Sequence, residues 1–168
     1  MKRVSQHTET HESMSLTFNQ FLIDRSFSLT KKSFFNLLNL DIRPSQIKDT
    51  CGESEIIKEG YLKGLFTGDQ LSQSDFRFMP NNSVLYYLDG FSESVEEWGE
   101  DRQVFKGFLK KLSDKLSDNI SGTYLINKEW FDEDSPKVRS REHHIYDFYL
   151  LIVWQHDSTL IVCEWSAD

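Results

Sequence analysis

The segment 129–151 combines the residue types that catalysis and metal binding require. Its sequence, EWFDEDSPKVRSREHHIYDFYLL, holds acidic side chains, basic side chains and a histidine pair directly before a long apolar run. Carboxylates and imidazoles serve as general acids and bases, and both bind metal ions. The segment is therefore a candidate for an active site or, alternatively, for an acidic surface that binds another protein.

Strand geometry separates the members of this cluster. If residues 143–155 form a strand, His143 and Asp147 lie about 13 Å apart on one face. That separation is too large for the two side chains to share a metal ion. Glu142 and His144 remain on one face, but they would need further ligands from elsewhere. We expect the start of a core strand here, and a metal-assisted hydrolase that uses Glu142 and His144 stays as an alternative.

Other candidate motifs are weaker. His7 and His11 have a metal-binding spacing only on a helix, and their surroundings do not favour one. The tripeptide at 156–158, His-Asp-Ser, is adjacent in sequence, whereas the members of a catalytic triad come from separate elements. The sequence has no GxSxG, P-loop or GxGxxG motif. We predict no catalytic residue, no metal site and no cofactor.

Two acidic segments contain aromatic residues and favour protein recognition. Residues 89–101, DGFSESVEEWGED, hold six carboxylates and no basic residue, and residues 129–134 hold four carboxylates beside a Trp-Phe pair. Aromatic side chains supply buried contact area, and carboxylates steer and bind lysine or arginine. The predicted partner-binding residues are Glu93, Glu96, Glu97, Trp98, Glu100, Asp101, Glu129, Trp130, Phe131, Asp132, Glu133 and Asp134.

The distribution of charge supports a basic partner. The 168 residues carry a net charge of −8, yet residues 1–48 have seven basic and four acidic side chains. The excess of acid therefore lies in the rest of the chain. Such a surface repels phosphates and anionic lipids, which disfavours direct binding to nucleic acids or membranes. No stretch is apolar enough to span a bilayer, and the N-terminus lacks the features of a signal peptide, so we expect a cytoplasmic protein.

Periodicity predicts the elements of the N-terminal half. Residues 1–13 are polar and aperiodic, which is typical of a mobile tail. Residues 14–70 are predicted to be mainly helical, although 14–27 could be helix or strand. One helix follows Thr30 as N-cap, and another runs from Ser54 to Gly68.

The apolar periodicity of the C-terminal half predicts mainly strands and one long helix. We predict a hairpin over 75–90, an amphipathic helix over 100–118 and a short strand at 123–127. The best signal is a hairpin ending at Trp165, in which Leu150 opposes Trp165, Ile152 opposes Cys163 and Trp154 opposes Ile161. Both of its faces are apolar, so it should be central and covered on both sides. Cys163 should be a small buried hydrophobe.

Together these elements predict a single α+β domain over 14–168. It has an N-terminal helical portion, then a mainly antiparallel sheet of about five strands over 75–165 with the 100–118 helix packed on it. Its physical profile is that of a bacterial immunity or antitoxin-type inhibitor, an acidic protein that masks a basic, possibly nuclease, toxin. The alternatives are a DNA-mimic inhibitor, the hydrolase described above, or a subunit or chaperone of a larger assembly.

Overall fold

The computed structural model describes residues 2–39, 62–63, 66–67, 70–117, 122–132, 134–138 and 147–167. The strands are β1 (Lys2–His11), β2 (Met14–Leu22), β3 (Leu62–Lys63), β4 (Phe66–Thr67), β5 (Arg77–Met79), β6 (Thr123–Asn127), β7 (Phe148–His156) and β8 (Thr159–Ala167). The helices are α1 (Lys31–Asn39), α2 (Asn81–Asp89) and α3 (Arg102–Leu116), and the short 3-10 turns are η1 (Gln73–Asp75), η2 (Gly90–Glu93), η3 (Val95–Trp98) and η4 (Lys128–Trp130). None of the described helices has both the length and the apolar character needed to cross a membrane.

The architecture is α+β, as predicted, and its main sheet is antiparallel. The sheet has six strands in the order β1-β2-β8-β7-β6-β5, one more than the five expected. The β7–β8 hairpin has the predicted register, with Leu150 opposite Trp165 and Trp154 opposite Ile161. It lies at the centre of the sheet because both of its faces are apolar.

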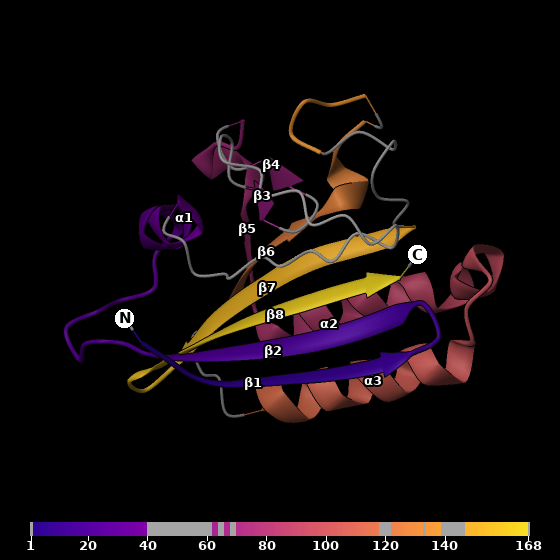
Figure 1. Ribbon diagram of the computed structural model, residues 1–168, viewed down its shortest axis with the longest axis horizontal. Helices are drawn as coiled ribbons and strands as arrows, with labels where there is room; N and C mark the ends of the chain where they lie inside the picture. Colours follow the sequence, from indigo (N-terminus) through magenta and orange to yellow (C-terminus); the bar gives the residue numbers. More distant parts are fainter. Residues whose placement is uncertain are drawn as a thin grey trace, which may run out of the picture.

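Helices and loops cover the two faces of this sheet separately. Figure 1 shows α2 and α3 below the sheet, and α1, β3 and β4 above it. The first core lies between the sheet and α2 and α3, and the second lies on the opposite face. Members of the first core include Leu16, Phe18, Val84, Leu88, Phe105, Phe148, Trp154, Cys163 and Trp165, and members of the second include Phe21, Phe34, Phe66, Phe76, Tyr149, Leu151 and Val153. Cys163 is fully buried, as predicted, and burial raises the pKa of its thiol.

The N-terminal residues are not a tail. Residues Lys2–His11 form β1, which pairs antiparallel with β2 at the edge of the sheet. The prediction was wrong because β1 has no buried apolar face, and its side chains from Val4 to His11 are exposed or half-buried. β1 is a strand because its backbone forms hydrogen bonds with β2. Backbone hydrogen bonding requires no periodic apolar residues, so the sequence shows no periodicity here.

The segment before the long helix is also different from its prediction. Residues Asn81–Asp89 form helix α2, where the sequence predicted the second strand of a hairpin. Val84 and Leu88, four residues apart, are both fully buried against the first core. This helical spacing competes with the aromatic and β-branched composition that favoured a strand, and packing decided the outcome.

The helical prediction for 14–70 holds only in part. Helix α1 follows Thr30, whose Oγ1 accepts a hydrogen bond from the Ser33 amide at 3.1 Å, as an N-cap does. Residues Met14–Leu22 are strand β2, and Leu62–Lys63 pairs with Phe66–Thr67 as strands, so no helix runs through to Gly68. The rest of the helix predicted from Ser54 lies outside the described residues.

Helix α3 matches its prediction closely. It spans Arg102–Leu116 and buries Phe105, Phe108, Leu112 and Leu116 on one face. The Asp101 carboxylate accepts hydrogen bonds from the amides of Gln103 and Val104 at 2.6 and 3.3 Å. These bonds satisfy amides that have no partner within the helix, so Asp101 fixes where the helix begins.

Candidate functional site

The 89–101 acidic segment continues directly from α2. It forms the turns η2 and η3 and lies at the right-hand end of the molecule in Figure 1, next to the start of α3. Glu93, Glu96 and Glu97 are exposed there. Glu93 lies 3.9 Å from the guanidinium of Arg102, which is the limit of an ion pair. Among the described residues, Glu96 and Glu97 form no ion pair.

The aromatic residues of this segment point into the protein. Trp98 stacks on Phe148 with ring centroids 5.5 Å apart and an interplanar angle of 23°. Phe91 packs against Phe148 at 5.2 Å, and both aromatic residues are half-buried against the first core. Their role is to attach the acidic turns to the sheet.

Two of the predicted binding residues serve the fold. Glu100 is only 4% exposed, and its carboxylate accepts a hydrogen bond from the Ser13 hydroxyl in the β1–β2 turn. Asp101 is exposed but caps α3 with its carboxylate. The structure therefore separates the segment into exposed carboxylates before Trp98 and structural carboxylates after it.

The 129–134 acidic segment lies elsewhere, at the top of Figure 1 around η4. Glu129, Asp132 and Asp134 are exposed, and Glu133 lies outside the described residues. Basic side chains accompany these acids. The guanidinium of Arg77 lies 3.9 Å from the centroid of the Trp130 ring, and the Lys137 ammonium lies 5.7 Å from that of Phe131.

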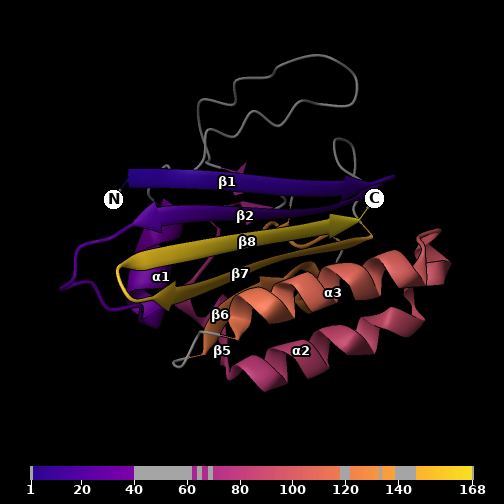
Figure 2. The same cartoon turned by 90° about the horizontal axis from the view of Figure 1, so that it is seen from below.

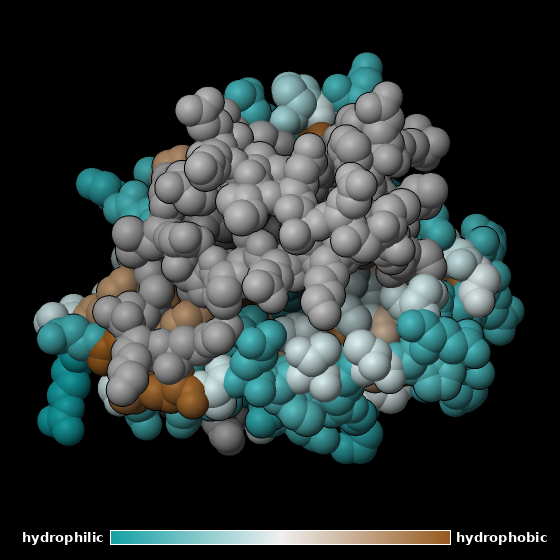
Figure 3. All heavy atoms as spheres, in the orientation of Figure 1, coloured by the Kyte–Doolittle hydropathy of each residue, from teal (hydrophilic) through white to brown (hydrophobic). Residues whose placement is uncertain are grey.

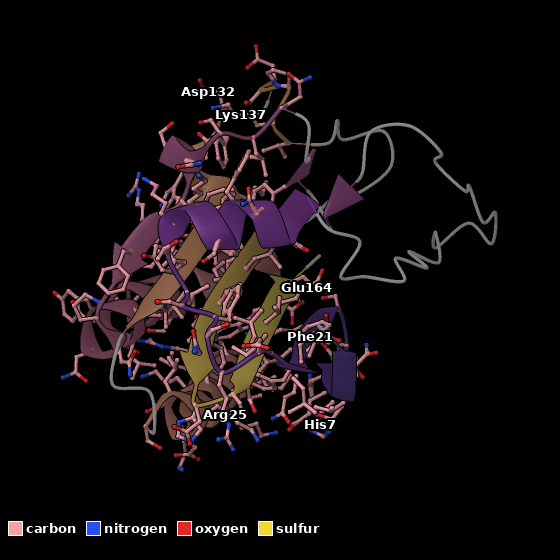
Figure 4. All side chains as sticks on the ribbon, turned by 90° about the vertical axis from the view of Figure 1, so that its left-hand side faces the viewer. His7, Phe21, Arg25, Asp132, Lys137 and Glu164 are labelled. Atoms are coloured by element: carbon pink, nitrogen blue, oxygen red, sulfur yellow. The ribbon has the colours of Figure 1, made fainter. Side chains whose placement is uncertain are left out.

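An ion pair anchors the end of this second segment. The Lys137 ammonium lies 2.7 Å from the Asp75 carboxylate, which also accepts a hydrogen bond from the Ser72 amide at 2.7 Å. Partial burial opposes ionisation of Asp75, but the bonds from Lys137 and Ser72 outweigh it and hold the pKa of this carboxyl below its ordinary value. Figure 4 shows Asp132 and Lys137 at the same end of the molecule.

Tyr87 connects the two acidic segments. Its hydroxyl oxygen accepts hydrogen bonds from Asn127 Nδ2 at 2.8 Å and from Trp130 Nε1 at 2.9 Å. Its ring also contacts Phe91, with centroids 5.2 Å apart. Burial raises the pKa of the Tyr87 phenol above its ordinary value. A single side chain on α2 thus contacts one aromatic residue of each segment, Phe91 in the first and Trp130 in the second.

Sequence reasoning missed the exposed aromatic residue of this region. Tyr86 is 84% exposed, whereas Trp98 and Trp130 are half-buried. On α2 it lies three residues before the exposed Asp89, so the two side chains share one face of the helix. We call Tyr86, Asp89, Glu93, Glu96 and Glu97 the Tyr86 surface. A helix prediction for 81–89 would have indicated that Tyr86 is exposed, because Val84 and Leu88 then define the buried face.

The histidine-containing candidates do not form a site in the part of the chain that the structure describes. Glu142 and His144 lie outside it, and β7 begins only at Phe148. His7 and His11 lie on strand β1, where four residues span about 13 Å. No group of three or more His, Cys, Asp or Glu side chains among the described residues is arranged to hold a metal ion.

Comparison with known proteins identified no similar protein. The sequence matches no protein-family model and no curated protein, and the structure matches no solved structure.

Proposed function

We propose that this chain is an immunity- or antitoxin-type inhibitor, an acidic protein that binds and masks a basic toxin of the nucleic-acid-cleaving kind. The Tyr86 surface is the observation that carries the proposal. Tyr86 is 84% exposed and shares a face of α2 with Asp89, and the turns that follow α2 carry the exposed Glu93, Glu96 and Glu97. Among the described residues Glu96 and Glu97 form no ion pair, and Glu93 lies 3.9 Å from Arg102, the limit of one. Aromatic anchors surrounded by charge are typical of interfaces between proteins.

The net negative charge of the chain favours a basic protein as the partner. The net charge of −8 and the pI near 5.1 favour rapid association with a basic protein, because opposite fields steer the encounter. In a nuclease-type toxin, the lysine and arginine side chains that hold phosphate would be the ones that Glu93, Glu96 and Glu97 bind. Such binding would exclude the nucleic acid from the toxin.

The second segment is assigned a smaller share of this binding. Asp132 and Asp134 are exposed, but Lys137 and Arg77 lie within the same region. Neighbouring cations reduce the attraction that a basic partner experiences. Carboxylates near Tyr86 should therefore contribute more to association than carboxylates near Trp130.

The test is capture of the partner from the native host, followed by association kinetics. We expect the full chain to retain a basic protein, with an association rate that falls steeply as salt is raised. Glu97→Lys should slow association by about tenfold at low salt, whereas it should leave unfolding by urea unchanged. Tyr86→Ser should instead mainly speed dissociation, because it removes contact area.

A matched control separates local binding from total charge. Asp114→Lys makes the same change in net charge on the exposed side of α3, about 18 Å along the helix axis from its start. It should slow association much less than Glu97→Lys. Equal effects of the two substitutions, or capture of no basic protein, would refute the proposal.

A further inference from the structure

The outer edge of β1 is a long run of backbone hydrogen-bonding groups. β1 is the terminal strand of the six-stranded sheet and pairs with β2 on one side. Figure 2 shows it at the border of the described sheet, with α2 and α3 lying toward the other side. An edge strand of this kind can add a further strand from another chain.

Among the described residues, an irregularity that protects this edge lies at one end of β1. A register shift between Arg3 and Ser5 interrupts the ladder there, and bulges of that type discourage pairing. From Ser5 to His11 the pairing with β2 is regular, and this stretch contains no proline. The opposite edge differs, because β5 has only three residues.

The side chains of β1 present an imidazole and a carboxylate at alternate positions on one face. His7 lies opposite Phe18 and Glu9 lies opposite Leu16, and both of these β2 residues belong to the first core. His7 and Glu9 therefore lie on the face of the sheet that carries α2 and α3. His7 Nε2 is 3.1 Å from Glu9 Oε1, and Glu9 also forms an ion pair with Lys111 of α3.

We propose that β1 pairs antiparallel with β1 of a second copy of this chain, about a two-fold axis at Thr8. In this register His7 of each copy lies opposite Glu9 of the other, which makes two imidazole–carboxylate pairs per dimer. Gln6 then lies opposite Thr10, so the other face pairs polar with polar side chains. The two sheets become one continuous sheet.

Neighbouring registers are less favourable. A two-fold axis at His7 places the two His7 side chains opposite each other, and an axis at Glu9 does the same with two carboxylates. Two carboxylates directly opposite each other on a strand pair are destabilising, and an axis at His7 leaves both Glu9 side chains without an imidazole partner across the pair. Pairing of imidazole with carboxylate within β1 itself therefore selects both the occupant and the register.

The surroundings of the edge suit a polar contact. The face drawn in Figure 3 is hydrophilic over its lower middle and right, where much of β1 and β2 runs in Figure 1, and hydrophobic atoms gather at its lower left. His7 lies at the opposite end of the molecule from Asp132 and Lys137 in Figure 4, and none of the pairing residues belongs to the Tyr86 surface. The dimer therefore neither requires nor excludes the proposed toxin-binding function. A negative result for the dimer would leave that function untouched, and the reverse also holds.

Cysteine crosslinking tests the register. In a Cys51→Ser background, Thr8→Cys places two thiols opposite each other across the axis, about 5 Å apart between Cα atoms. Thr10→Cys is the matched control on the same strand and face, and its two Cα atoms lie about 13 Å apart, beyond the reach of a disulfide. We expect mild oxidation to crosslink the Thr8→Cys chain and leave the Thr10→Cys chain largely monomeric. Equal crosslinking of both chains, or preference for Thr10→Cys, would overturn the register.

Sedimentation of the full chain tests the dimer itself. A strand pair buries less than the roughly 1,200 Å² of a standard interface, so we expect a dissociation constant on the order of 10–100 μM. His7→Glu places a carboxylate opposite Glu9 of the other copy and should weaken the dimer about tenfold. The exchange variant H7E/E9H again places an imidazole opposite each carboxylate and should restore dimerisation. Gln103→Glu, a charge control on α3, should have no effect. A monomer at millimolar concentration, or a dimer that His7→Glu does not weaken, would refute the proposal.

Discussion

In the 89–101 acidic segment, the fold divides the carboxylates by position along the chain. Those before Trp98 are exposed, and those after it close the β1–β2 turn or cap α3. In the 129–134 acidic segment, the described carboxylates are all exposed but lie among Arg77 and Lys137. Two segments that both combine acidic and aromatic residues therefore differ in their electrostatic surroundings, because a charge acts together with its neighbours in space.

Aromatic residues show the same contrast. Trp98 is held by ring stacking on Phe148, whereas Trp130 is held by a hydrogen bond to Tyr87 and by the cation of Arg77. The first attachment is apolar, whereas the second adds polar contacts to the packing of Trp130 against both cores. The first segment is therefore held by ring packing, and the second by packing together with specific bonds.

Replacement of Trp98 should have the largest effect on stability. Trp98→Ala removes the stack on Phe148 and the contact with Phe105, and we expect it to lower the free energy of unfolding by about 2–4 kcal/mol. Phe131→Ala in the second segment should cost only about 1–2 kcal/mol, because among the described residues that ring packs on one buried ring, Phe66. Urea unfolding measures both values. Equal losses would show that the two segments are attached in the same way.

Removal of the Tyr87 hydroxyl should have the next largest effect. Tyr87→Phe leaves Asn127 Nδ2 and Trp130 Nε1 without their acceptor, which should cost about 1–3 kcal/mol. Tyr86→Phe is the matched control, since its exposed hydroxyl has no hydrogen-bond partner among the described residues. The free energies of unfolding of the two variants, measured in urea, should differ clearly. Similar free energies would show that Tyr87 does not connect the two segments.

Alkaline pH provides a second measurement on Tyr87. Because its pKa is raised in the folded protein, the native state retains the proton at a pH where the unfolded chain has lost it. This contribution to stability is complete below about pH 10, the ordinary pKa of tyrosine, and is lost as the pH rises through the folded value. Tyr87→Phe should therefore flatten the fall in stability above that pH. An unchanged slope would show that Tyr87 does not cause it.

Replacement of single carboxylates should have smaller effects on stability, and these should differ between the two segments. Asp101→Ala removes the cap of α3 and should cost about 1 kcal/mol. Asp134→Ala removes an exposed carboxylate and should change the free energy of unfolding by less than about 0.5 kcal/mol. Asp101→Asn should recover most of the loss, because its amide oxygen can still accept from the amides. Failure of that recovery would show that charge rather than capping matters.

The smallest change is expected from the exposed pair in the first segment. Glu96→Lys combined with Glu97→Lys should alter stability by less than about 0.5 kcal/mol, because neither carboxylate contributes to a described ion pair. Thermal unfolding at low and high salt would detect any contribution. A substantial loss would mean that the fold uses these carboxylates, and it would remove the basis for assigning them to a partner.

The sequence alone determined the parts of the fold that depend on neighbouring residues. The β7–β8 register follows from alternating apolar residues around a short turn, and α3 follows from a helical apolar period. The acidic segments were also visible, because composition is local. These features need no knowledge of what packs against them.

Only the tertiary structure decided which side chains of those segments are free. Glu100 is buried because the β1–β2 turn reaches it from 87 residues away, and β1 is a strand because β2 offers it backbone partners. Tyr86 is exposed because the burial of Val84 and Leu88 makes 81–89 a helix. Each outcome depends on contacts between segments distant in sequence, and local propensity carries no record of them.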